Sequence, residues 1–260
     1  MHLSLTVALV PPVARPPSHV VCSGAAYDYC IQSLGCTGEE AAKAEGKLFS
    51  RTAVRLNRTQ IDSVCTWLQS ELDLSDVELR KFVLRAPSLL SCGVETKLAP
   101  MLEWFRSTLD LGNAELKKFL IRKPPLLGCS PEANLAPKLE WLQSTLDLSD
   151  LELKKLGRNP VVLGLSIEKN IEPTLDWMRR RLDLDVGQLK KIVLGNPNLL
   201  GFSIEENMEP TLEWLQTRLA LNTAQLRKAV LIKPQLLGYS VEKKMKPTLD
   251  WMQMRLDLEE

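Results

Sequence analysis

The stretch PNLLGFSIEENMEPTLEWL, residues 197–215, has counterparts along most of the chain, with prolines, leucines and tryptophan in the same places. Its tryptophan belongs to a series whose members lie 37, 37, 36, 37 and 37 residues apart, namely Trp67, Trp104, Trp141, Trp177, Trp214 and Trp251. Two prolines in each unit keep the same period. A fixed period of this length indicates an array in which every unit is one supersecondary structure.

This period divides the chain into a half unit, 60–74, and five complete units: 75–111, 112–148, 149–184, 185–221 and 222–258. The third unit is one residue short, because KKFLIRKP (117–124) becomes KKLGRNP (154–160). We expect 60–258 to form one helical repeat domain. Residues 1–59 are expected to be a targeting, disordered or poorly defined segment, with a helix possible over 39–46.

Each unit opens with a helix-start signature. A residue that favours the N-cap is followed three positions later by Glu or Gln, which is the spacing of a capping box. The N-cap residues are Ser75, Gly112, Ser149, Asp185 and Asn222, and their partners are Glu78, Glu115, Glu152, Gln188 and Gln225. The first helix of unit one then carries an apolar stripe of Leu79, Phe82 and Val83. We expect each first helix to end before the next proline.

A Pro-x-Leu-Leu-Gly connector follows, in which we expect buried leucines and a glycine with an unusual backbone angle. A second helix is expected to start near Ser203. Pro210 is either the first residue of its main part, after a 3₁₀ turn, or the site of a kink. One unit cannot bury the apolar faces of both helices, whereas stacked units can. The sequence therefore predicts an all-α fold, a right-handed α-solenoid of tandem helix-turn-helix repeats.

Two other sets of residues in register are interpreted as packing groups. The tryptophans are favoured as packing between neighbouring units over the alternative of base-stacking platforms. Cys92 and Cys129 occupy the position of Leu165, Phe202 and Tyr239, so we expect them to be buried apolar fillers.

Composition excludes several classes of function. The only histidines are His2 and His19, outside the repeats, and the sequence lacks phosphate-loop and dinucleotide-binding glycine motifs. None of the six cysteines forms a Cys-x-x-Cys pair. An active site needs a unique constellation of residues, yet nearly every polar residue of the repeats is repeated. We therefore expect no enzyme activity, no catalytic residues, no metal, no cofactor and no small-molecule substrate.

The charged residues point to a different activity. The 33 basic and 32 acidic residues give a net charge of +1, so any basic surface must arise by segregation. The first helix of every unit carries a basic pair, and four of the units carry further bases near its end. The pairs are Arg80–Lys81, Lys117–Lys118, Lys154–Lys155, Lys190–Lys191 and Arg227–Lys228, and the further bases are Arg85, Arg122, Lys123, Arg158 and Lys233. Stacking would align them into a ladder that contacts phosphates.

Charge differs between units, and this predicts where contact is concentrated. Unit five has seven basic and three acidic residues, whereas unit four has three basic and five acidic residues. We expect binding through units one to three and unit five. The alternative is that these lysines and arginines are simply solvated, because duplication copies a solvated pair as faithfully as a functional one.

Each unit combines a first helix, a Pro-x-Leu-Leu turn and a second helix that contains Pro-x-Leu-(Glu/Asp)-Trp. In this combination the chain resembles the mitochondrial transcription termination factor (mTERF) family over about 60–258. The clearest motifs are PSLL (87–90), PPLL (124–127), PNLL (197–200) and PQLL (234–237), and unit three departs with PVVL (160–163). The resemblance implies a helical repeat protein of mitochondria or chloroplasts that binds double-stranded DNA or structured RNA and influences organelle gene expression. Five units are fewer than many members carry, and a fragmentary gene product is a further possibility.

The remaining expectations concern location and partners. Residues 1–10 are largely apolar and lead into Pro11–Pro12, which fits an organelle or secretory targeting segment, a disordered tail or a wrongly assigned start. No apolar run reaches the roughly 18 residues of a membrane-spanning helix, so no membrane contact is expected. We expect a monomer that binds nucleic acid. The alternative is an α-solenoid scaffold that binds protein partners on its concave face.

Overall fold

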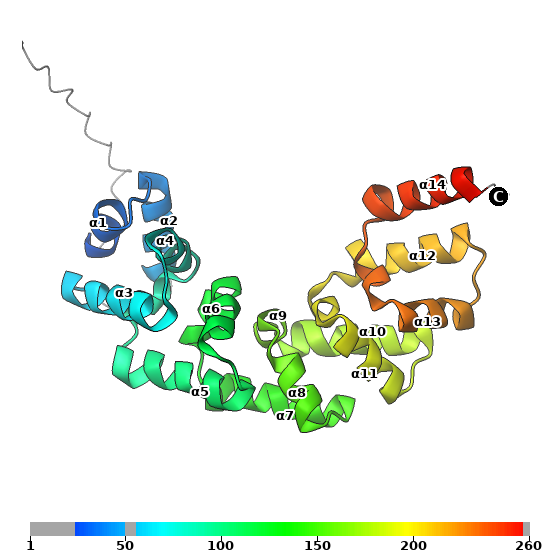
Figure 1. Ribbon diagram of the computed structural model, residues 1–260, viewed down its shortest axis with the longest axis horizontal. Helices are drawn as coiled ribbons and strands as arrows, with labels where there is room; N and C mark the ends of the chain where they lie inside the picture. The colour runs from blue at the N-terminus through cyan, green and yellow to red at the C-terminus, as the bar shows by residue number, and fades with distance from the viewer. Residues whose placement is uncertain (1–23, 50–55, 257–260) are drawn as a thin grey trace, which may run out of the picture. The chain divides into compact units, whose positions relative to one another are not determined.

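The computed structural model describes residues 24–49 and 56–256. Within these residues the chain is helical and contains no strand, which confirms the predicted all-α repeat class (Figure 1). The chain divides between Thr96 and Lys97 into two compact units, which we call the N-terminal and C-terminal units. The proposed targeting segment, 1–10, lies outside the described residues.

The N-terminal unit contains four α-helices, α1 (Ala25–Gln32), α2 (Gly38–Phe49), α3 (Arg58–Leu72) and α4 (Asp76–Arg85), and the 3₁₀ turn η1 (Pro87–Ser91). The helix expected over 39–46 is confirmed by α2. Helices α1 and α2 pack through a small buried cluster of Cys30, Cys36, Ala41 and Ala44. Residues 25–32 and 38–49 are therefore helical, and the assignment of 1–59 as a targeting, disordered or poorly defined segment stays a prediction.

In the C-terminal unit, first helices, connectors and second helices alternate. The first helices are α6 (Asn113–Arg122), α8 (Asp150–Gly157), α11 (Val186–Gly195) and α13 (Thr223–Ile232). The second helices are α5 (Ala99–Leu109), α7 (Ala136–Leu146), α10 (Glu172–Leu182), α12 (Glu209–Arg218) and α14 (Lys246–Leu256). One large core of leucine, isoleucine, valine and methionine side chains runs from Leu142 to Met245 through successive repeats. Stacking of the units thus buries what one unit alone would expose.

The capping boxes form as the sequence predicts. In α4 the Ser75 backbone N–H donates to Glu78 Oε2 at 2.9 Å, and the Glu78 N–H donates to Ser75 Oγ at 3.3 Å. Equivalent reciprocal boxes start α8, α11 and α13. At Gly112 only one half exists, the bond from its N–H to Glu115 Oε2 at 3.2 Å, because glycine has no side chain. These contacts fix the first residue of each first helix.

The connectors are 3₁₀ turns in four of the five repeats: η1, η3 (Pro124–Gly128), η6 (Pro197–Gly201) and η8 (Pro234–Gly238). Both leucines of η6 are buried, as expected. The unusual glycine angle was a wrong expectation, because Gly35 is the only glycine with positive φ in the described residues. At position 238 a glycine is needed for packing, because an added Cβ would lie 2.4 Å from Phe202 Cε2 of the preceding repeat. A side chain there would push the two repeats apart.

The second helices begin with a π-helical turn rather than a 3₁₀ turn or a kink. These turns are η2 (Val94–Leu98), η4 (Pro131–Leu135), η5 (Ile167–Ile171), η7 (Ile204–Met208) and η9 (Val241–Met245). In η7 the Met208 N–H donates to the Ser203 carbonyl, five residues back, at 3.2 Å. Pro210 is then the second residue of α12. Proline lacks an N–H and crowds the carbonyl four residues earlier, and the wider π turn relieves this crowding.

In the interior of the C-terminal unit the tryptophans pack against the core, which is the role that the sequence favoured over base stacking. Trp141, Trp177 and Trp214 are partly buried against it, and the indole Nε1–H of Trp177 donates to Glu209 Oε2 at 2.8 Å. Trp251 differs, because 60% of its surface is exposed. Cys92 and Cys129 are half-buried, so their description as buried fillers is only partly correct. Burial nevertheless raises the pKa of the Cys129 thiol.

Candidate nucleic-acid interface

The capping box determines where each basic pair lies on its first helix. In α4 the N-cap is Ser75, and the apolar residues Leu79, Phe82 and Val83 face the core. Arg80 and Lys81 lie between them and differ by about 100° around the axis, since an α-helix has 3.6 residues per turn. Arg80 is half-buried and Lys81 is exposed. The two members of a pair therefore point in different directions.

The first members at Arg80, Lys190 and Arg227 are engaged in contacts within the protein. Arg80 Nη2 lies 2.6 Å from Glu40 Oε2 on α2. Arg227 Nη1 donates to the backbone carbonyl of Asp183 at 2.6 Å and to its carboxylate at 2.8 Å. Lys190 Nζ donates to the Asp147 carbonyl at 2.8 Å and lies 3.5 Å from Glu152 Oε2. Lys117 is also half-buried.

The aspartates that receive these cations in the C-terminal unit share one structural role. Each is the C-cap of a second helix and has a left-handed backbone, with φ of 52° at Asp110, 50° at Asp147 and 51° at Asp183. Carbonyls at a helix C-terminus lack intrahelical partners, and the helix dipole favours a cation there. We call the contact between one of these aspartates and a basic side chain from a later repeat a carbonyl clamp. It ties together repeats whose contacting residues lie 43 to 48 positions apart in the sequence.

Unit three forms its carbonyl clamp with a different residue. Lys154, its first pair member, is exposed. Arg158 instead donates from Nε to the Leu109 carbonyl at 2.9 Å and from Nη2 to the Asp110 carbonyl at 2.6 Å. Its guanidinium also lies 3.4 Å from the Asp110 carboxylate. The expected ladder residue Arg158 is thus held by the protein itself.

Electrostatics follow these contacts. Hydrogen bonds from the Thr37 backbone and from Arg80 hold the pKa of the Glu40 carboxyl below its usual value. The hydrogen bond with Glu40 raises the pKa of the Arg80 guanidinium. Backbone and hydroxyl donors of Ser149, with a smaller effect of Lys190, lower the pKa of Glu152. These ion pairs occupy charges that the sequence assigned to the ladder.

The second members of the pairs are the available cations. Lys81, Lys118, Lys155, Lys191 and Lys228 are all exposed, and none forms a hydrogen bond or ion pair within the described residues. Lys155 and Lys191 come from consecutive repeats and line the same surface hollow of about 330 Å³. The hollow is also lined by Glu152, Gly187, Lys190, Leu194 and Gly195. Consecutive repeats therefore present their second lysines to one site.

The further bases near the ends of the first helices have mixed surroundings. Arg85, Arg122 and Lys233 are exposed, and Lys123 is half-buried. Lys123 lies against the connector of the next repeat, because a Cβ added to Gly164 would come within 2.6 Å of its Cε. Lys233 Nζ lies 6.0 Å from the centre of the Tyr239 ring. The ladder is thus brought together only in part.

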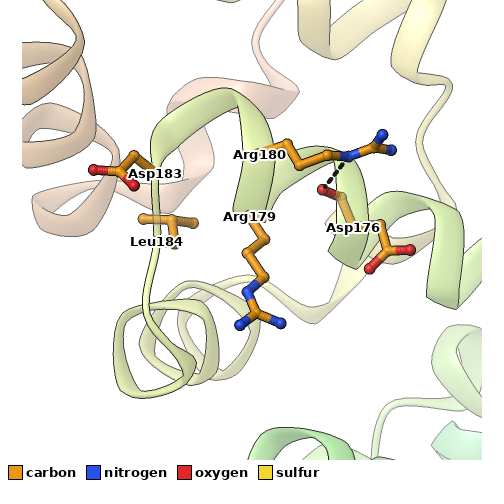
Figure 2. Close-up of a pocket in the computed structure, with 5 residues that line it drawn as sticks. All are labelled: Asp176, Arg179, Arg180, Asp183 and Leu184. Carbon is orange, nitrogen blue, oxygen red and sulfur yellow. Dashed lines mark hydrogen bonds between the residues drawn. The ribbon is translucent and has the colours of Figure 1, made fainter.

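Sequence reasoning overlooked a second group of bases, the run Arg179–Arg180–Arg181 near the C-terminus of α10. Arg179 and Arg180 line an open hollow of about 640 Å³ with Asp176 and Asp183 (Figure 2). Arg180 Nε donates to the Asp176 carbonyl at 3.2 Å. The run was visible in the sequence as three consecutive arginines found in no other unit. A comparison of positions shared by all units does not reveal this run, because it occurs in one unit alone.

Within the described residues, no cluster of histidine, cysteine, aspartate and glutamate side chains is arranged to bind a metal ion. The described helices include none with the length and apolarity needed to cross a membrane. The acidic residues that precede the tryptophans, Glu103, Glu140, Asp176, Glu213 and Asp250, are exposed on the second helices.

Comparison with known proteins gives one positive result. The family model described as mTERF matches residues 46–180 and 178–255, which is most of the chain. The match begins within α2 and includes all five complete repeats nearly to their end. Proteins of this family are helical repeat proteins without enzyme activity that bind nucleic acids, typically in organelles. A search of curated proteins found no match.

Proposed function

Because the chain belongs to the mTERF family, we propose that it binds double-stranded DNA or structured RNA in a mitochondrion or chloroplast. There it would regulate organelle gene expression, for example by terminating transcription. The contact surface in the C-terminal unit consists of the exposed second lysines Lys118, Lys155, Lys191 and Lys228; Lys81, the exposed second lysine of the N-terminal unit, is a separate contact residue. The observation that carries the proposal is the hollow shared by Lys155 and Lys191.

The physical basis is neutralisation of phosphate charge. Ammonium groups of successive repeats that form no ion pair within the described residues can each replace a counterion of the nucleic-acid backbone. Such contacts position a protein on a duplex but do not read base sequence. We therefore expect binding that is strongly dependent on salt and only weakly dependent on sequence.

The basic residues of the predicted ladder have two different roles. Arg80, Arg158, Lys190 and Arg227 bind carboxylates and carbonyls of the protein and hold neighbouring segments together. The second lysines, with exposed bases such as Arg122 and Lys233, remain for the ligand. The acidic excess of unit four lies away from its first-helix pair, at Glu205, Glu206, Glu209 and Glu213. We therefore include Lys191 in the contact surface, although the charge of unit four as a whole argued against it.

The test compares two double variants that lose the same charge. Lys155→Gln/Lys191→Gln removes the two lysines of the shared hollow, and Lys97→Gln/Lys169→Gln removes two exposed lysines of the π-helical turns as a matched control. Binding of a labelled duplex is followed by fluorescence anisotropy from low to high salt. We expect the first variant to weaken binding at low salt and to reduce the log–log salt slope by up to about 1.8, at about 0.9 for each phosphate that is no longer neutralised.

Equal weakening by the two double variants would show that the lysines act only through net charge and would remove the proposed surface. Failure of the unmodified protein to bind duplex DNA or structured RNA at low salt would favour the protein-binding scaffold. A fluorescent fusion of the full chain tests the compartment separately. Accumulation outside mitochondria and chloroplasts would contradict the organellar part of the proposal.

A further inference from the structure

The turn after α1 brings two buried cysteines together. Helix α1 ends at Gln32, and Gly35, with φ of 61°, adopts the left-handed backbone that reverses the chain. The Cys36 N–H then donates to the Cys30 carbonyl, six residues back, at 2.8 Å. Only 1% of Cys30 and 6% of Cys36 is exposed, in the small cluster through which α1 packs against α2 (Figure 1). We call these two cysteines the thiol pair.

The two thiols are in contact and are not equivalent. They share a hydrogen bond that acts to raise the pKa of Cys30 and to lower the pKa of Cys36, which is the effect of Cys30 donating its S–H to the Cys36 sulfur. Burial is the main cause that raises the pKa of the Cys30 thiol to about 12. Burial also raises the pKa of Cys36, but the nearby Arg80 guanidinium on α4 opposes this effect. Cys36 is therefore the sulfur that ionises more readily.

A third buried cysteine lies close to the thiol pair but has another partner. Cys65 on α3 is 1% exposed and lies near enough to Cys30 to contribute to its raised pKa. The Tyr29 hydroxyl donates a hydrogen bond to the Cys65 sulfur. Because a disulfide has strict geometry and forms most easily between sulfurs that already touch, Cys36 rather than Cys65 is the expected partner of Cys30.

We propose that the thiol pair is a site of reversible oxidation, at which hydrogen peroxide converts Cys30 and Cys36 into a disulfide. The Cys36 sulfur attacks one peroxide oxygen and the O–O bond breaks. A sulfenic acid forms on Cys36, and its thiol proton leaves with the other oxygen as water. The Cys30 sulfur then attacks the Cys36 sulfur, an S–S bond replaces the S–O bond, and the Cys30 proton leaves in a second water. The two thiols together supply the two electrons that reduce the peroxide.

The surroundings of the thiol pair set the rate and the consequence of this reaction. The thiolate is the reacting form of cysteine, and burial disfavours it at both sulfurs, so oxidation should be slow until peroxide accumulates. The product closes a short ring between α1 and the start of α2, which restricts the unfolded chain. We therefore expect amide hydrogen exchange in α1 to slow by about tenfold or more in the oxidised protein.

The test counts free thiols in the full chain. The reduced protein is treated with hydrogen peroxide, denatured in an alkylating agent and weighed by mass spectrometry. All six cysteines should be alkylated before treatment, the six minus the pair should be alkylated after it, and dithiothreitol should restore six. Cys30→Ser and Cys36→Ser should form no disulfide, whereas the matched controls Cys22→Ser and Cys65→Ser should form it as the unmodified chain does. In Cys30→Ser the sulfenic acid of Cys36 lacks its partner, so dimedone should label Cys36.

The charge beside Cys36 is tested by Arg80→Gln. This variant should form the disulfide several-fold more slowly, because its neutral side chain no longer favours the thiolate. Lys81→Gln is the matched control, since it removes the same charge from the neighbouring exposed residue and should leave the rate unchanged. Equal rates in the two variants would contradict Cys36 as the attacking sulfur.

Six alkylated cysteines after peroxide treatment would overturn the proposal. So would a disulfide that persists in Cys30→Ser or Cys36→Ser, or one that is lost in Cys65→Ser, because another pair would then be the site. Circular dichroism verifies that each variant is folded. The double variant Lys155→Gln/Lys191→Gln should form the disulfide at the normal rate, which separates this result from that of the proposed lysine surface.

Discussion

Units three (149–184) and four (185–221) differ by one residue in length, and the difference changes three features of the repeat. The first helix shortens from the ten residues of α11 to the eight of α8. The connector changes from the 3₁₀ turn η6 to a short α-helix, α9 (Pro160–Leu163). The source of the carbonyl clamp moves from Lys190 in the basic pair of unit four to Arg158, which aligns with Gly195.

What stays constant between the two units is a cation at the C-terminal carbonyls of an earlier second helix. Unit three supplies it from another position and with another side chain, while its pair member Lys154 is left exposed. The constant requirement of these two repeats is thus the clamp contact, not a base at a fixed place in the repeat. A sequence position can then carry a structural lysine in one unit and a solvated lysine in the next.

The largest expected effect concerns the connector. Val162 in α9 and Leu199 in η6 occupy equivalent positions, and both are completely buried. We expect Leu199→Ala to lower the free energy of unfolding by about 2–5 kcal/mol, because it leaves a cavity in the core. Val162→Ala removes fewer atoms and should cost about 1.6 kcal/mol from the loss of two buried methyl groups. Urea denaturation followed by tryptophan fluorescence measures both. An equal loss would indicate that the short connector of unit three is packed as tightly as that of unit four.

A smaller effect separates the clamp residues from the exposed bases. Arg158→Gln removes donors to two backbone carbonyls, and Lys190→Gln removes one. We expect Arg158→Gln to lower the free energy of unfolding by about 1–2 kcal/mol and Lys190→Gln to lower it by about 1 kcal/mol. These losses are small for hydrogen bonds of charged groups, because both side chains keep some solvent contact. Lys154→Gln, at the position of Lys190 but exposed, should cost less than about 0.5 kcal/mol.

The pair Lys154→Gln and Lys190→Gln is its own control, since both variants remove one lysine from the same aligned position. Similar losses in the two would contradict the exchange of the clamp between Lys190 and Arg158. The same proteins can be tested for duplex binding. The clamp variants should affect stability more than affinity, and the reverse holds for Lys155→Gln/Lys191→Gln.

Much of the fold could be predicted from the sequence, because its signals are local. Capping boxes such as Ser75 with Glu78 act over three residues, and the proline of each connector ends the helix before it. The π-helical turns could not be predicted, because Pro210 is compatible with several helix starts. The role of Gly238 could not be predicted either, since it depends on Phe202 of the preceding repeat.

The candidate site was predictable as a set of residues but not as a surface. Neighbouring bases such as Lys190 and Lys191 are alike in sequence and both line the shared hollow. Only packing shows that Lys190 reaches the Asp147 carbonyl, whereas Lys191 forms no hydrogen bond or ion pair within the described residues. A signal for the clamp was nevertheless present. Aspartate recurs in the Leu-Asp-Leu segments that end the second helices, at positions 73, 110, 147 and 183. A carboxylate at regular intervals should have suggested internal partners for bases at the same interval.

The smallest expected effect is a pH dependence that unit three has and unit four lacks. Glu152 of the unit-three capping box titrates, whereas its counterpart Gln188 does not. Hydrogen bonds from Ser149 hold the pKa of Glu152 below its ordinary value of 4.5 in the folded protein. A carboxyl whose folded pKa is lowered stabilises the protein above its unfolded pKa, and this contribution disappears as pH falls through the folded value.

Glu152→Gln therefore removes a stabilisation that is present at pH 7 and absent at low pH. We expect the melting temperature of the unmodified protein to fall more between pH 7 and pH 3 than that of Glu152→Gln, measured by circular dichroism. Glu213→Gln is the matched control, because Glu213 is exposed and makes no hydrogen bond within the described residues. If Glu213→Gln changed the pH dependence as much as Glu152→Gln did, the effect would come from net charge. The capping box of unit three would then be no more sensitive to acid than that of unit four.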